Sequence, residues 1–119
     1  PLALLRPILS KLGLLTREAL YKKSHGQAAK TAGLIITRQR PASANNVTFV
    51  TLEDETGSIN LVIWKKIADK YSAILLGSYL IGVSGQIQRE GTVLHLVTEQ
   101  LVDLSHLLDN LRTQSRDFC

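Results

Sequence analysis

The chain has 119 residues, of which 45% are hydrophobic, and its formal net charge is +4 at pH 7. This length fits one compact domain with its own hydrophobic core. Cys119 is the single cysteine, so the chain cannot form an internal disulfide, and its cysteine content does not indicate an oxidising compartment. The absence of a run of about 18 uncharged apolar residues excludes a membrane-spanning helix, and we expect a cytoplasmic protein.

Residues 1–30 are expected to form a helical extension or linker ahead of the main domain. Leucines recur with helical spacing over residues 2–23, and Thr16 is placed to cap a second short helix after a break near Gly13. The chain opens on Pro1 and contains no methionine, so we expect a fragment or a processed piece of a longer protein.

The periodicity then changes and predicts a β domain over residues 31–101. Strands are expected at residues 33–38, 47–52, 58–64, 79–88 and 92–98. A helix is expected between the third and fourth strands, over residues 65–76, where apolar residues recur on one helical face. Three strands, a helix and two strands form the order of a five-stranded, Greek-key OB-fold barrel, although other small barrels share it. Residues 102–119 are expected to form a C-terminal helix and a polar tail.

The second and third strands are expected to form a hairpin in which Glu53 faces Ser58. Side chains alternate across a strand, so this register separates two faces. The inner, largely aliphatic face is expected to comprise Thr48, Val50, Leu52, Ile59, Leu61 and Ile63. The outer face then comprises Val47, Phe49, Thr51, Asn60, Val62 and Trp64.

The outer face predicts a stacking platform for single-stranded nucleic acid. Phe49 and Trp64 offer aromatic rings, and stacking is tolerant of base sequence because every base has a π-face. Thr51 and Asn60 are expected to supply hydrogen bonds beside the rings. The alternative is that the leading helices cover both rings and form a second small core.

Basic side chains are expected at the borders of this face. Residues 1–46 hold eight basic groups and one acidic group, whereas the rest of the chain holds six basic and nine acidic groups. This asymmetry is typical of an oriented approach to a polyanion, although a solvated surface produces it as well. Four residues are expected to contact phosphates or bases: Arg38, Arg40, Lys65 and Arg89.

Catalytic and metal-binding motifs are not predicted. The three histidines and Cys119 lack the spacing of zinc ligands, and His95 is expected to be a partly exposed structural residue. The acidic run 53–55 is expected to be a solvated turn rather than a magnesium site. We therefore expect no cofactor and no catalytic site within this chain.

Several segments resemble successive motifs at the C-terminal end of the error-prone, translesion-type C-family bacterial DNA polymerases, paralogues of the replicative alpha subunit. They are residues 33–41 (GLIITRQRP), 49–57 (FVTLEDETG), 85–91 (GQIQREG), 103–108 (DLSHLL) and 115–118 (SRDF). Residues 1–7 are similar to the stretch that precedes the OB domain in that family. Cys119 stands where the family usually has histidine.

The resemblance implies that the OB domain contacts single-stranded template in a DNA polymerase used in translesion synthesis and DNA repair. The catalytic carboxylates of such a polymerase belong to a palm domain outside this chain. Contacts with accessory mutagenesis proteins or the sliding clamp are implied as well. Two other interpretations stay open: a protein-interaction module that docks a polymerase subunit through the outer face or residues 104–111, and an anticodon-type RNA-binding domain.

Overall fold

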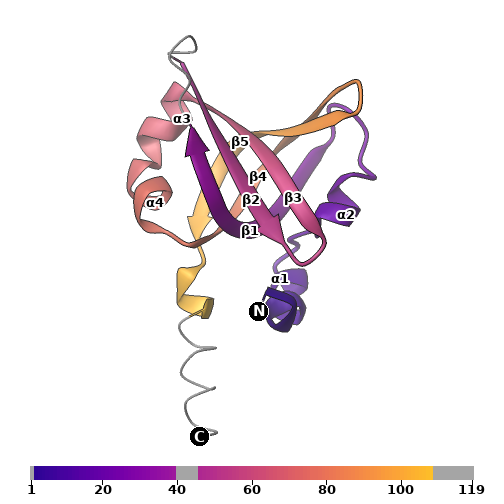
Figure 1. Ribbon diagram of the computed structural model, residues 1–119, viewed down its shortest axis with the longest axis vertical. Helices are drawn as coiled ribbons and strands as arrows, with labels where there is room; N and C mark the ends of the chain where they lie inside the picture. Colours follow the sequence, from indigo (N-terminus) through magenta and orange to yellow (C-terminus); the bar gives the residue numbers. More distant parts are fainter. Residues whose placement is uncertain (1, 40–45, 109–119) are drawn as a thin grey trace, which may run out of the picture.

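Five strands close into a barrel in the computed structural model, which describes residues 2–39 and 46–108. The strands are β1 (Ala28–Gln39), β2 (Val47–Asp54), β3 (Gly57–Trp64), β4 (Leu80–Glu90) and β5 (Val93–Asp103). They follow one another around the barrel in the order β1-β2-β3-β5-β4 (Figure 1). Neighbouring strands are antiparallel except β3 and β5, which run parallel.

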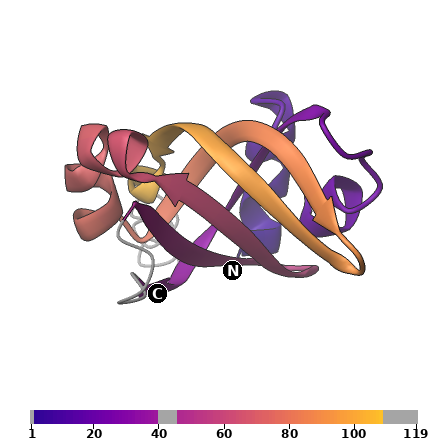
Figure 2. The ribbon, with the colours of Figure 1, turned by 90° about the horizontal axis from the view of Figure 1, so that it is seen from above.

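Short helices precede the barrel and interrupt it. They are η1 (Leu2–Leu5), α1 (Arg6–Lys11), α2 (Arg17–Leu20), α3 (Lys65–Lys70) and α4 (Ser72–Gly77), and residues 105–108 are helical as well. The leading helices and the α3–α4 pair lie on opposite sides of the barrel (Figures 1 and 2). The fold class expected from the sequence, a mainly β OB-type barrel with helices in these three places, is confirmed.

Several element boundaries differ from the sequence expectation. The last strand, expected to end at residue 98, continues to Asp103, because its final residues pair with the start of β4. The single helix expected over residues 65–76 is divided at Tyr71, whose backbone (φ −110°, ψ 25°) leaves the helical region. The first strand begins at Ala28 instead of residue 33, because its first half pairs with β4, from Ala28 opposite Gln86 to Leu34 opposite Leu80. Its second half pairs with β2, so β1 joins the two sides of the barrel.

The hairpin of β2 and β3 has the expected register, with Glu53 opposite Ser58. Five of the six inner residues are buried in the main core: Val50, Leu52, Ile59, Leu61 and Ile63. The sixth, Thr48, is partly exposed. A second, smaller core lies where leucines of the leading helices, including Leu5 and Leu9, pack against Ala32, Leu80 and Leu104.

Asp54 joins the tip of this hairpin to the leading helices. Its carboxylate is inaccessible to solvent and accepts hydrogen bonds from the backbone N–H groups of Thr56 (2.7 Å), Gly57 (3.1 Å) and Arg17 (2.6 Å) and from the Thr56 hydroxyl (2.8 Å). The expectation that residues 53–55 form a solvated turn is therefore wrong for Asp54. A buried carboxylate needs such donors, and two segments supply them, the hairpin turn and the start of α2.

Arg6 and Glu55 form an ion pair on the surface of the same junction. The guanidinium donates to both carboxylate oxygens, at 2.8 and 2.6 Å. These hydrogen bonds are the main cause that lowers the pKa of Glu55, and the same pairing raises the pKa of Arg6. A bidentate pair of this kind holds α1 against the hairpin tip.

The lowered pKa predicts a pH dependence that Glu55→Gln removes. Because the carboxylate titrates at lower pH in the folded chain, its stabilisation is complete above the unfolded pKa and disappears as pH falls through the folded pKa. We expect wild type to exceed Glu55→Gln by about 0.2–1 kcal/mol in unfolding free energy at neutral pH. Urea unfolding from neutral to acidic pH should show this difference vanish, and a constant difference would contradict the assignment.

Candidate nucleic-acid interface

The outer face of the β2–β3 hairpin presents two exposed aromatic rings. Phe49 is 37% exposed and Trp64 is 52% exposed. Phe49 lies opposite Val62, and Trp64 is two residues further along β3. The rings are thus diagonal neighbours on adjacent strands, a relation that places side chains about 7–8 Å apart. Two rings at this spacing offer stacking surfaces to two bases of one strand.

The leading helices do not cover these rings. Their buried leucines pack against Ala32, Leu80 and Leu104, in the smaller core. Trp64 directly precedes α3, and the α3–α4 pair lies on the other side of the barrel from the leading helices (Figure 2). The alternative of a second core over Phe49 and Trp64 is therefore wrong.

The outer face continues beyond the hairpin onto the other strands of the barrel. Residues paired on neighbouring strands form two rows across β1, β2, β3, β5 and β4, in that order. One row is polar and consists of Thr37, Thr51, Asn60, His95 and Gln88. The adjacent row consists of Gln39, Phe49, Val62, Val97 and Gln86. Hydrogen-bonding side chains therefore lie directly beside the ring of Phe49.

Sequence reasoning missed Thr37, His95 and Gln86 as members of these rows. Alternation around the buried residues Leu94 and Leu96 was enough to place His95 on the outside. Its position beside Asn60 depends on the parallel pairing of β3 with β5, which no turn between the two strands reveals.

Arg38 and Lys65 are engaged within the protein. The Arg38 guanidinium donates to the backbone carbonyl groups of Leu75 and Ser78, the latter at 3.1 Å, and so ties β1 to the end of α4. Lys65 pairs with Asp69 one helical turn away at 2.7 Å, and both side chains are largely exposed. Arg40 lies outside the described residues.

Arg89 connects β4 to the segment that follows α2. Its guanidinium donates to the carbonyl groups of Lys23, at 3.0 and 2.7 Å, and of Tyr21. Its backbone N–H donates to His25 Nδ1 at 2.9 Å. The structure therefore brings Phe49, Thr51, Asn60 and Trp64 together on one face, whereas Arg89 belongs to a junction between distant segments.

The described residues contain neither a metal-binding cluster nor a membrane-spanning helix. Within residues 2–39 and 46–108, no group of three or more His, Cys, Asp or Glu side chains could hold a metal ion. In the same part of the chain, no helix has the length and apolar character needed to cross a membrane.

Comparison with known proteins gives a consistent result. Residues 29–104 match the family model described as "OB-fold nucleic acid binding domain". Over 99% of its length, the chain is 53% identical to the error-prone DNA polymerase of Alkalilimnicola ehrlichii and 49% identical to that of Methylococcus capsulatus. It spans 12% and 11% of those two proteins, respectively.

Solved structures of low sequence identity share the fold. Asparaginyl-tRNA synthetase from Pyrococcus horikoshii superposes with a TM-score of 0.64 at 15% identity, over 77% of this chain and 22% of that protein. The second OB-fold domain of replication protein A from Methanococcus maripaludis superposes with a TM-score of 0.52 at 14% identity, over 71% of this chain and 91% of that domain.

Proposed function

Because the chain belongs to the family of OB-fold nucleic acid binding domains and is homologous to a region of error-prone DNA polymerases, we propose that it binds single-stranded template DNA. The observation that supports this most strongly is the pair of exposed rings, Phe49 and Trp64, on an open sheet face. Unpaired bases stack on such rings, and the chain presents both on the hairpin whose aliphatic side fills the barrel.

Hydrogen bonding beside the rings would orient each stacked base. Thr51 and Asn60 lie opposite each other between β2 and β3, and His95 follows Asn60 on β5. Hydroxyl, amide and imidazole groups offer both donors and acceptors, which suits the polar edges of several bases. Binding of this kind tolerates many sequences, as a domain that holds any template requires.

Positive charge would guide the phosphate backbone along the edges of the face. Lys65 is exposed and, with Arg40, is proposed to contact phosphates. Arg38 and Arg89 use part of their guanidinium groups to fix the borders of the barrel. We propose that their remaining N–H groups contact the strand, since a guanidinium carries five N–H donors.

The wider role follows from the polymerase relatives, of which this chain spans about one-ninth. We propose that the domain holds template for a DNA polymerase active in translesion synthesis and repair in the cytoplasm, with nucleotidyl transfer performed elsewhere in the longer protein. Accessory mutagenesis proteins and the sliding clamp are proposed as further partners.

Titration with oligothymidylate at several salt concentrations tests DNA binding. Trp64 is the only tryptophan in the sequence, so quenching of its emission reports stacking at this face. We expect log K to fall linearly with log salt, with a slope of about −0.7 for each phosphate contacted. Unchanged emission and a salt-independent affinity would contradict the proposal, and tighter binding of a matched oligouridylate RNA would favour an anticodon-type RNA-binding domain.

A further inference from the structure

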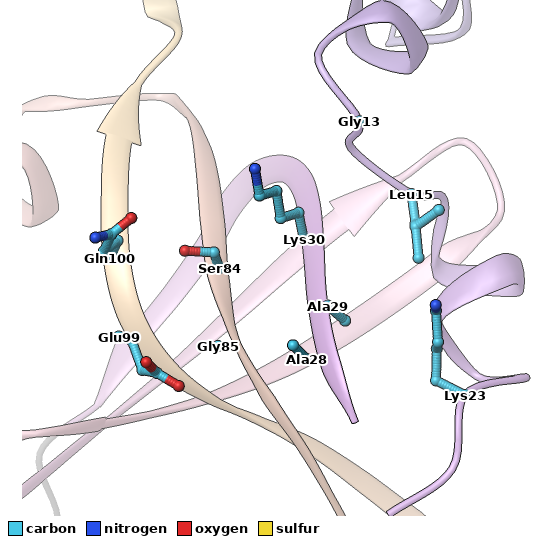
Figure 3. A pocket seen from close by; sticks show the side chains of 10 residues that line it. All are labelled: Gly13, Leu15, Lys23, Ala28, Ala29, Lys30, Ser84, Gly85, Glu99 and Gln100. Carbon is cyan, nitrogen blue, oxygen red and sulfur yellow. The ribbon is translucent and has the colours of Figure 1, made fainter. Parts of the chain in front are cut away.

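A hollow of about 440 Å³ lies on a different side of the barrel, over β1, β4 and β5. Three polar residues cross its floor as register neighbours: Lys30 on β1, Ser84 on β4 and Gln100 on β5. Lys23 stands on the far side of β1 from Ser84, and Glu99 lies lower on β5 (Figure 3). We call this feature the Lys30 hollow.

A bulge between β4 and β5 lies at the Lys30 hollow. Ser84 pairs with Gln100 while the next residue, Gly85, pairs with Thr98, so Glu99 is the extra residue. A Cβ atom on Gly85 would lie 2.0 Å from the carbonyl oxygen of Val97. Only glycine fits this site, which lies opposite Ala29 on β1.

The two lysines at the hollow are available to a ligand. Within the described residues, the ammonium groups of Lys23 and Lys30 have neither an ion pair nor a hydrogen-bond acceptor. Arg38, Lys65 and Arg89 are in contrast all bonded within the protein. An unpaired cation at Lys30, in one row with the hydroxyl of Ser84 and the amide of Gln100, is a set that suits a phosphate group, and Lys23 adds positive charge across β1 (Figure 3).

We propose that the Lys30 hollow binds a backbone phosphate of the nucleic acid, on a stretch of strand that extends beyond the face of Phe49 and Trp64. This inference rests on the proposed function. The two regions are joined by β1, which carries Lys30 near one end and Thr37 near the other, seven residues or about 23 Å apart. Single OB folds cover about 4–16 nucleotides, so a longer strand can reach both.

The carboxylate of Glu99 gives the proposal its sharpest test. It lines the same hollow and repels a phosphate, so Glu99→Gln is expected to tighten binding of a 16-nucleotide oligothymidylate, whereas Lys30→Gln is expected to weaken it. Each change should be about two- to fivefold, as for a partly screened charge. Misfolding cannot produce the gain in affinity, and Lys22→Gln, at an exposed lysine that does not line the hollow, is the matched control.

Oligonucleotide length separates the two sites. A five-nucleotide oligomer is short enough to occupy the face of Phe49 and Trp64 alone, so its affinity should be equal in wild type, Lys30→Gln and Glu99→Gln. Lys30→Gln should also reduce the magnitude of the salt slope for the longer oligomer by about 0.7, the loss of one phosphate contact. Suppose that wild type, Lys30→Gln and Glu99→Gln bind the longer oligomer with equal affinity while Phe49→Ala binds it more weakly. The hollow is then not a phosphate site, and the proposed function is unaffected.

A second probe distinguishes failure of the proposed function itself. Inorganic phosphate, titrated while the backbone amide NMR signals of Lys30, Ser84 and Gln100 are followed, reports the hollow without any stacking. Shifts at these amides support a phosphate site. If phosphate shifts these signals but neither oligonucleotide binds, the proposed function fails. The hollow then binds free phosphate, and the proposal that it binds a nucleic-acid backbone is wrong.

Discussion

Replacing Phe49 with alanine is expected to weaken the binding of oligothymidylate about 5- to 150-fold, because a base stacked on an aromatic ring contributes about 1–3 kcal/mol. Trp64→Ala is expected to have an effect of the same size. Both rings point away from the core, so the loss should appear in binding and not in folding. Polarisation of a labelled oligonucleotide measures the affinity, and thermal unfolding followed by circular dichroism checks the fold.

Tyr79→Ala is the matched control for the loss of an exposed ring. Tyr79 is 72% exposed and lies between α4 and β4, outside the two rows of the interface. Its replacement should leave the affinity unchanged. If Tyr79→Ala and Phe49→Ala weaken binding equally, or if neither does, the face of β2 and β3 is not where bases stack.

Asp54→Ala is expected to lower the free energy of unfolding by about 3–5 kcal/mol. The substitution leaves the partly buried backbone N–H groups of Arg17, Thr56 and Gly57 without their acceptor, and each unsatisfied buried donor costs about 1–3 kcal/mol. It also removes the side chain that holds the start of α2 against the hairpin tip. Urea unfolding measures the change.

The neighbouring carboxylate provides the control for this stability effect. Glu53 is exposed, and its side chain makes no hydrogen bond or ion pair within the described part of the chain. Glu53→Ala should therefore change the unfolding free energy by less than about 0.5 kcal/mol. Similar losses for Glu53→Ala and Asp54→Ala would show that the buried network adds nothing to stability.

The hairpin was predictable because its determinants are local. Alternation over β2 and β3 and the turn at residues 55–56 set the register that places Glu53 opposite Ser58. The start of β1 depends instead on pairing with β4, more than 50 residues away along the chain. Small residues such as Ala28 and Ala29 carry no strand signal of their own, so the sequence pattern placed the start too late.

In the candidate site, too, the features set by local sequence were predictable and those set by distant segments were not. The rings of Phe49 and Trp64 followed from alternation alone. The hydrogen bonds of Arg89 join it to carbonyl groups 66 and 68 residues earlier in the chain, and no sequence spacing signals a partner that is a backbone atom. Burial of Asp54 likewise depends on the approach of α2, because an acidic residue before a glycine-containing turn is typical of solvent exposure.

Closure of the barrel through β1 also bears on solubility. Over residues 28–34 this strand covers one side of β4, and its second half covers one side of β2. Unpaired strand edges recruit other copies of a protein into aggregates, and β1 removes this hazard on both neighbours. The chain can therefore display apolar rings to water, and a shortened chain that began within β1 would expose the backbone of β4 to association between molecules.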